Sequence, residues 1–84
     1  MHVTTLQMTQ EINGILFGIT EKDNFDKGSD LFEQGVNSLQ MAILIDELNK
    51  IFNLGVSLEI LAEGASIDAI VTSLNKKINL QKNG

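Results

Sequence analysis

The apolar residues of this chain recur at steps of three and four residues, and this spacing constrains the fold more than any other feature. Such steps place apolar side chains on one face of an α-helix, whereas a half-buried β-strand needs strict alternation of apolar and polar residues. The chain has no proline, and its seven glycines stand mostly where a helical pattern starts or stops. We therefore predict an all-α fold, a small bundle of three long helices and one short helix, without any strand.

Two long helices are predicted in the first two thirds of the chain. The first extends from Thr5 to Phe17 or Gly18, with a capping box of Thr4 and Gln7 at its start. The second extends from Ser38 to about Phe52. The side chains expected to face the core are Met8, Ile12, Ile15, Leu16 and, just past the first helix, Ile19, followed by Leu39, Ala42, Leu44, Ile45, Leu48, Ile51 and Phe52.

The polar segment between these helices, residues 20–37, is unusually long for a structureless connection inside a small domain. Asp30 can cap a short turn within it, with Glu33 at the reciprocal position, and Gly35 can end that turn. The apolar residues that can hold the segment against the core are Leu31, Phe32 and Val36. We therefore expect that this segment is either functional or carries local structure.

A short third segment and a long fourth helix follow. Ser57 caps the third segment, which extends from Leu58 to Ala62 and ends at Gly64. Ser66 caps the fourth helix, which extends from Ile67 to about Ile78. Its expected core residues are Ile67, Ile70, Val71, Leu74 and Ile78. The charged residues in its first and last turns complement the helix dipole, and these are Asp68, Lys76 and Lys77.

The charge and length of the chain argue against several classes of function. Eleven acidic residues stand against six lysines and no arginine, for a net charge of -5, which disfavours binding to a phosphate backbone. The longest uninterrupted apolar run, Met41 to Ile45, is too short to span a bilayer, and the first residues do not resemble a signal peptide. We expect a cytoplasmic, monomeric single domain over residues 1–84, with residues 1–4 and 79–84 frayed. It can be free-standing, which we favour, or a domain excised from a larger protein.

Metal sites of the familiar kinds are also disfavoured. Cysteine is absent, and the single histidine, His2, has no second imidazole with which to bind zinc, so we expect it to be inert. An EF-hand loop starting at Asp23 would have Phe25 and Lys27 at two positions that need oxygen ligands, and Gln34 in place of the closing glutamate. We therefore predict no metal.

Ser38 stands at the start of the second predicted helix, in the sequence GVNSLQ. It can be a plain N-cap, or its hydroxyl can accept a covalent group, because a phosphodiester is favoured beside the free amides of a helix start. Serine hydrolase chemistry is disfavoured, because Val36 and Gln40 replace the glycines of a nucleophile elbow and His2 would be the only available base. Taken alone, the short motif favours the plain N-cap.

The segment from Asp30 to Leu74 resembles the acyl and peptidyl carrier protein family without a gap. Gly35, Asn37, Ser38 and Leu39 match the core of that family, Gly-x-(Asp, His or Asn)-Ser-Leu. The other matching positions are the lead-in Asp30-Leu31-Phe32, then Leu48, Phe52, Val56, Leu58 and Leu61, and Ala65-Ser66-Ile67 before the last helix. This agreement in spacing is much more specific than the short motif.

The resemblance implies that Ser38 carries a 4'-phosphopantetheine arm, which a phosphopantetheinyl transferase takes from coenzyme A. The thiol of the arm would hold an acyl or aminoacyl group as a thioester, supplied by a loading enzyme and passed to downstream synthase or transferase enzymes. The chain itself would be no enzyme and would have no catalytic residue. The alternative is a non-catalytic helical adaptor that lacks the arm, and both readings predict the same fold.

Departures from the family pattern point to a subtype. Asn37 replaces the aspartate usual in fatty-acid carriers, so the chain looks closer to the polyketide or nonribosomal-peptide type. Positions that are commonly acidic in fatty-acid carriers hold Gln40, Ile43, Asn49 and Lys50. We therefore predict that partner enzymes dock on Asn37, Leu39, Gln40, Met41 and Ile43. The last two can instead pack under the loop.

Overall fold

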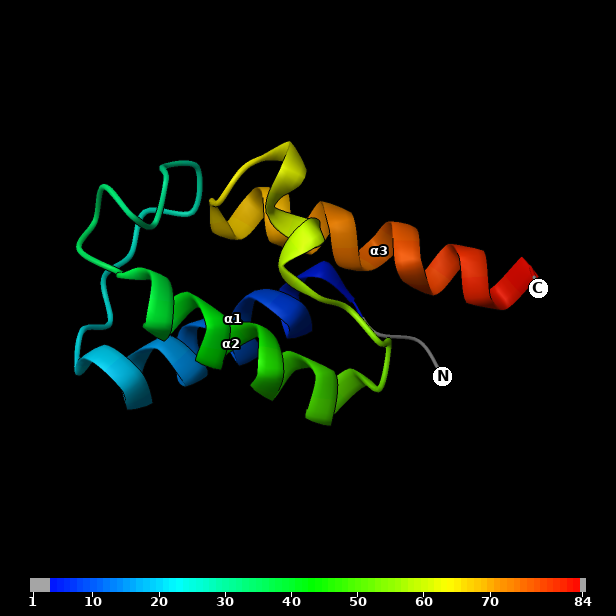
Figure 1. Cartoon of the computed structure of the whole chain (residues 1–84), viewed down its shortest axis with the longest axis horizontal. Helices are drawn as coiled ribbons and strands as arrows, with labels where there is room; N and C mark the ends of the chain where they lie inside the picture. The colour runs from blue at the N-terminus through cyan, green and yellow to red at the C-terminus, as the bar shows by residue number, and fades with distance from the viewer. Residues whose placement is uncertain (1–3, 84) are drawn as a thin grey trace.

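The computed structural model describes the backbone of residues 4–83 and the side chains of residues 4–79. The elements are α1 (Thr5–Thr20), α2 (Ser38–Phe52), the 3-10 helix η1 (Leu58–Glu63) and α3 (Ile67–Asn83), and no strand occurs among residues 4–83 (Figure 1). Helix α1 contacts both α2 and α3, while η1 packs on α3. The predicted all-α bundle of three long helices and one short helix is confirmed.

Helix α1 is longer than the sequence pattern predicted. The capping box is present, with Thr4 Oγ1 accepting from the Gln7 N–H at 3.0 Å and Gln7 Oε1 accepting from the Thr4 N–H at 2.8 Å. The predicted stop at Gly18 is wrong, because the helix continues to Thr20 and ends where Glu21 takes a left-handed conformation (φ 62°). The extra turn brings Ile19 against the core, and this burial offsets the helix-weakening effect of a glycine.

Helix α2 has the predicted bounds but buries a narrower face than predicted, with Met41 added to it. Met41, Leu44, Ile45 and Leu48 are buried, and they form one stripe at steps of three, one and three residues. Several residues assigned to the core from the sequence are exposed instead, namely Leu39, Ala42 and Ile51. The predicted face was too wide, because a single helix cannot turn residues on opposite sides of its axis toward the same core.

The predicted end of the last helix is also wrong, because α3 continues past Ile78 to Asn83 and includes most of the tail expected to fray. Lys76 and Lys77 therefore lie within the helix, away from its C-terminal end. Lys76 Nζ lies 2.7 Å from Glu63 Oε2 and Lys77 Nζ lies 3.8 Å from Glu59 Oε1, so both lysines link α3 to η1.

Thr4, one of the residues expected to fray, is the N-cap of α1. The predicted inert residue His2, with the rest of residues 1–3 and residue 84, lies outside the described part of the chain.

The predicted capping signals before η1 and α3 are present. Ser57 precedes η1, which is one residue longer than predicted and ends at Gly64, where φ is 134°. Ser66 Oγ accepts from the Ala69 N–H at 3.0 Å in the first turn of α3. Within η1 only Ile60 is buried, so this element is held mainly by its contacts with α3.

The segment between α1 and α2 is ordered by bonds to distant parts of the chain, and Figure 1 shows it at one end of the bundle beside the start of α2. Leu31 is buried and its N–H donates to the Ala65 carbonyl at 3.1 Å. The Asp68 N–H donates to the Lys27 carbonyl at 3.0 Å, which joins the segment to the first turn of α3. Val36 is buried as predicted, whereas Phe32, predicted to help hold the segment, is exposed.

Asn49 fixes the connection between α2 and η1. Its Oδ1 accepts from the Val56 N–H at 2.6 Å, and its Nδ2 donates to the Val56 carbonyl. We expect Asn49→Ala to lower the free energy of unfolding by about 1–3 kcal/mol, because both backbone groups of a buried residue lose their partner. Urea unfolding followed by circular dichroism measures this loss. The exposed Asn79→Ala is the control, and an equal effect at both positions would contradict the role of Asn49.

Candidate functional site

Ser38 is the first residue of α2, and its neighbour Asn37 is the N-cap. Asn37 Oδ1 accepts from the Gln40 N–H at 2.8 Å, and Gln40 Oε1 accepts from the Asn37 N–H at 2.9 Å. The interpretation of Ser38 as the N-cap is therefore wrong, because asparagine and glutamine form the capping box between them. Capping by Asn37 leaves the Ser38 hydroxyl available for chemistry.

The Ser38 side chain is exposed, and its hydroxyl has no hydrogen-bond partner among the residues that the structure describes. The amide groups at the start of a helix have no partner inside the helix. Here the Gln40 N–H is bonded to Asn37, and the Met41 N–H donates to the Asn37 carbonyl at 2.9 Å. The amides of Ser38 and Leu39 therefore remain next to the free hydroxyl, where the positive end of the helix dipole favours an anion.

A short turn holds Ser38 in this exposed position. Asp30 Oδ1 accepts from the Phe32 N–H at 2.7 Å, which confirms Asp30 as the cap of the turn. The Val36 N–H donates to the Leu31 carbonyl at 3.0 Å, and both of these side chains are buried. Gly35 closes the turn with φ 101°, a conformation that side chains rarely adopt. The chain therefore enters α2 from an anchored turn.

The five predicted docking residues do not form one surface. Leu39 is 70% exposed and Ile43 is 39% exposed, one helical turn apart. Met41 is fully buried in the core, so it cannot touch a partner in this conformation. Asn37 and Gln40 use their side chains in the capping box.

The charged groups of α2 lie toward its far end. Lys50 Nζ lies 3.3 Å from Asp46 Oδ2 and 3.7 Å from Glu47 Oε1. The hydrogen bond and the charge of Asp46, together with the charge of Glu47, raise the pKa of Lys50. These are the two carboxylates of α2, and Lys50 partly neutralises both. The surface of α2 next to Ser38 is therefore apolar and uncharged.

Two amide side chains with structural roles were missed by the sequence reasoning. Asn49 was noted only as a non-acidic position, yet it fixes Val56 as described above. Gln34 was noted only as an unsuitable calcium ligand. Its Oε1 accepts from the Asp26 N–H at 2.7 Å, and its Nε2 donates to the carbonyls of Asp26 at 2.9 Å and Ser29 at 3.1 Å. The sequence contains only a weak signal for these roles. Asn49 and Gln34 each have an amide side chain, which can both donate and accept hydrogen bonds, in or near a connecting segment.

Among the described residues, no group of three or more histidine, cysteine, aspartate or glutamate side chains could hold a metal ion. No helix in the described part of the chain is both long enough and apolar enough to cross a membrane.

Comparison with known proteins gives one match. The family model described as "phosphopantetheine attachment site" matches residues 6–74, which include all of α1 but its first residue, all of α2 and η1, and about half of α3. Comparisons with curated proteins and with solved structures gave no significant match.

Proposed function

Because the chain belongs to the phosphopantetheine attachment family, we propose that Ser38 is the residue that carries the 4'-phosphopantetheine arm. Members of this family carry the arm covalently and are carriers, not enzymes. The observation that supports Ser38 most strongly is its exposed hydroxyl, which has no partner among the described residues and stands beside the unpaired amides of the first turn of α2.

Attachment of the arm is a phosphoryl transfer from coenzyme A. Ser38 Oγ attacks the phosphorus that bears the pantetheine chain, and the pyrophosphate P–O bond of coenzyme A breaks. Adenosine bisphosphate leaves, and the hydroxyl proton passes to a base of the phosphopantetheinyl transferase. The carrier contributes the accessible nucleophile, and the amides of Ser38 and Leu39, at the positive end of α2, would stabilise the negative charge of the phosphodiester.

The loaded arm would hold an acyl or aminoacyl group as a thioester. Tethering keeps that group at high effective concentration for successive enzymes, so a carrier needs an accessible surface and no deep active site. We place the chain with the polyketide or nonribosomal-peptide carriers, because Asn37 replaces aspartate and the start of α2 is uncharged. Leu39 and Ile43 are the exposed apolar residues on which loading and downstream enzymes dock.

Intact mass tests the carrier function directly. We expect the protein, incubated with coenzyme A, magnesium and a broad-specificity phosphopantetheinyl transferase, to gain the mass of one phosphopantetheine group. A known carrier in the same reaction controls for transferase activity. Absence of any gain, while the known carrier is loaded, would support the alternative of a helical adaptor without the arm.

A further inference from the structure

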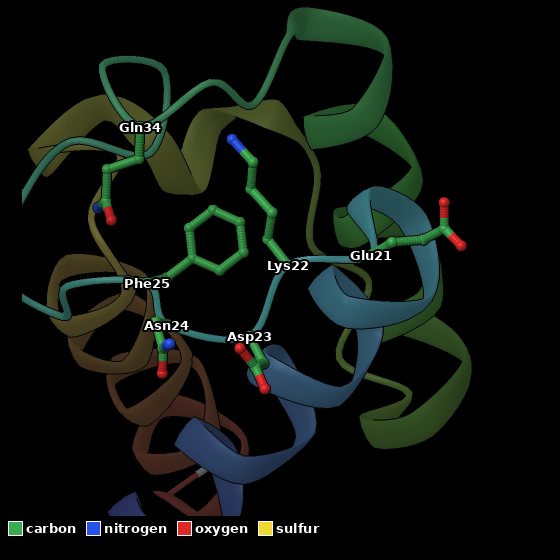
Figure 2. A pocket seen from close by; sticks show the side chains of 6 residues that line it. All are labelled: Glu21, Lys22, Asp23, Asn24, Phe25 and Gln34. Carbon is green, nitrogen blue, oxygen red and sulfur yellow. The ribbon is translucent and has the colours of Figure 1, made fainter.

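An open pocket lies in the segment that follows α1, beside the turn that leads to Ser38. Its volume is about 410 Å³ and its walls are residues 21–25 and Gln34 (Figure 2). The ring of Phe25 is half-buried against the core, and Figure 2 shows it between the side chains of Lys22 and Gln34. The three hydrogen bonds of Gln34 fix the opposite wall, so the pocket is formed before any ligand binds.

Lys22 connects this pocket to the Ser38 site. Its Nζ lies 3.2 Å from the position that a Cβ of Gly35 would occupy, and Gly35 stands three residues before Ser38. Figure 2 shows the Lys22 side chain passing beside the Phe25 ring, while the Glu21 carboxylate is directed away from the pocket. The ammonium group is therefore at the edge of the pocket nearest to the start of α2.

The ammonium group of Lys22 has no carboxylate partner among the side chains of residues 4–79. Lys50, Lys76 and Lys77 each lie within 4 Å of a carboxylate, whereas Lys22 forms no such pair with any side chain of residues 4–79. An unpaired ammonium beside Gly35, in the turn that leads to Ser38, is complementary in charge to a phosphodiester on that serine.

We propose that this pocket is a resting site for the phosphopantetheine arm, with Lys22 pairing the phosphodiester and Phe25 contacting the two methyl groups that follow it. The proposal rests on attachment of the arm at Ser38. The phosphodiester is the only charged group of the arm, so Lys22 pairs with that end. The rest of the arm, which is neutral and contains amides, extends past Lys22 toward Asp23. Resting there keeps the thiol close to the protein until a partner enzyme withdraws the arm.

The absence of cysteine makes the position of the arm measurable. After loading, the thiol of the arm is the only thiol in the molecule, so a thiol-reactive nitroxide labels it alone. We expect the label to broaden the backbone amide NMR signals of residues 22–25 and 34 more than those at the far end of α2. In Lys22→Gln this relaxation enhancement should fall by about two- to fivefold, the range for loss of one exposed ion pair.

Lys27→Gln is the matched control, because Lys27 is exposed in the same segment, has no acidic partner among residues 4–79 and lies outside the pocket walls. It should leave the broadening unchanged. Intact mass is measured before labelling, so failure to load the arm, which overturns the proposed function, is distinct from failure of the resting site. Full loading with no broadening around residues 22–25, or with equal broadening in wild type and Lys22→Gln, overturns the resting site alone.

Discussion

Ser38→Ala is expected to abolish loading of the protein completely while leaving its fold intact. The arm needs an oxygen nucleophile at that position, and alanine has none. The fold should not respond, because the start of α2 is capped by Asn37 and Gln40 and the Ser38 hydroxyl has no partner among the described residues. We expect a change in the free energy of unfolding within about 0.5 kcal/mol, as for other surface substitutions.

The matched control is Ser57→Ala, a second exposed serine at the start of a helical element. It should accept the arm at the wild-type rate in the same transferase reaction. Intact mass gives the extent of loading, and fragmentation of the loaded protein locates the modified residue. Loading of the Ser38→Ala variant would refute Ser38 as the attachment site without refuting the family.

Met41→Ala is expected to lower the free energy of unfolding by about 2–4 kcal/mol, because a fully buried side chain of the core leaves a cavity when it is truncated. This is a large share of the about 4–13 kcal/mol expected for a domain of this size. Circular dichroism during urea unfolding is the suitable probe, since the chain has neither tryptophan nor tyrosine. Loading should persist in whatever fraction of this variant remains folded.

Leu39→Ala should show the opposite pattern to Met41→Ala. Its side chain is 70% exposed, so we expect a stability change within about 0.5 kcal/mol and a slower transfer of the arm, because the transferase loses an apolar contact next to Ser38. Initial rates of loading at several carrier concentrations separate weaker docking from slower chemistry. A normal loading rate of Leu39→Ala would contradict the proposed role of this residue in docking. An unchanged free energy of unfolding of Met41→Ala would contradict the burial of the Met41 side chain in the core.

Local signals in the sequence predicted the starts of the helices well. Thr4 with Gln7 and Ser66 make the predicted caps, and Ser57 precedes η1 as expected. Each of these signals acts between residues that are close in the chain, so tertiary packing changes it little. At the start of α2 the position was right and the capping residue was wrong, because Asn37 competes with Ser38 for the same role.

Signals that depend on burial were less reliable. Gly18 was expected to end the first helix. Helix α1 continues past it to Thr20, because Ile19 packs against the core. Lys76 and Lys77 appeared to mark the end of a helix, yet they pair with Glu63 and Glu59 across the junction with η1. In both cases a contact between distant residues overrides the local preference.

The sequence by itself determined that this chain is helical, that Ser38 begins α2 and that the chain resembles the carrier family, because periodicity, capping motifs and residue spacing are all local properties. Only the tertiary structure decided which side of α2 faces the core, so that Met41 is buried and Leu39 is exposed. It also brought Lys22, near the start of the segment between α1 and α2, next to Gly35 near the end of that segment. The rotation of a helix and the approach of distant segments depend on how all the apolar faces pack together, and no single segment contains that information.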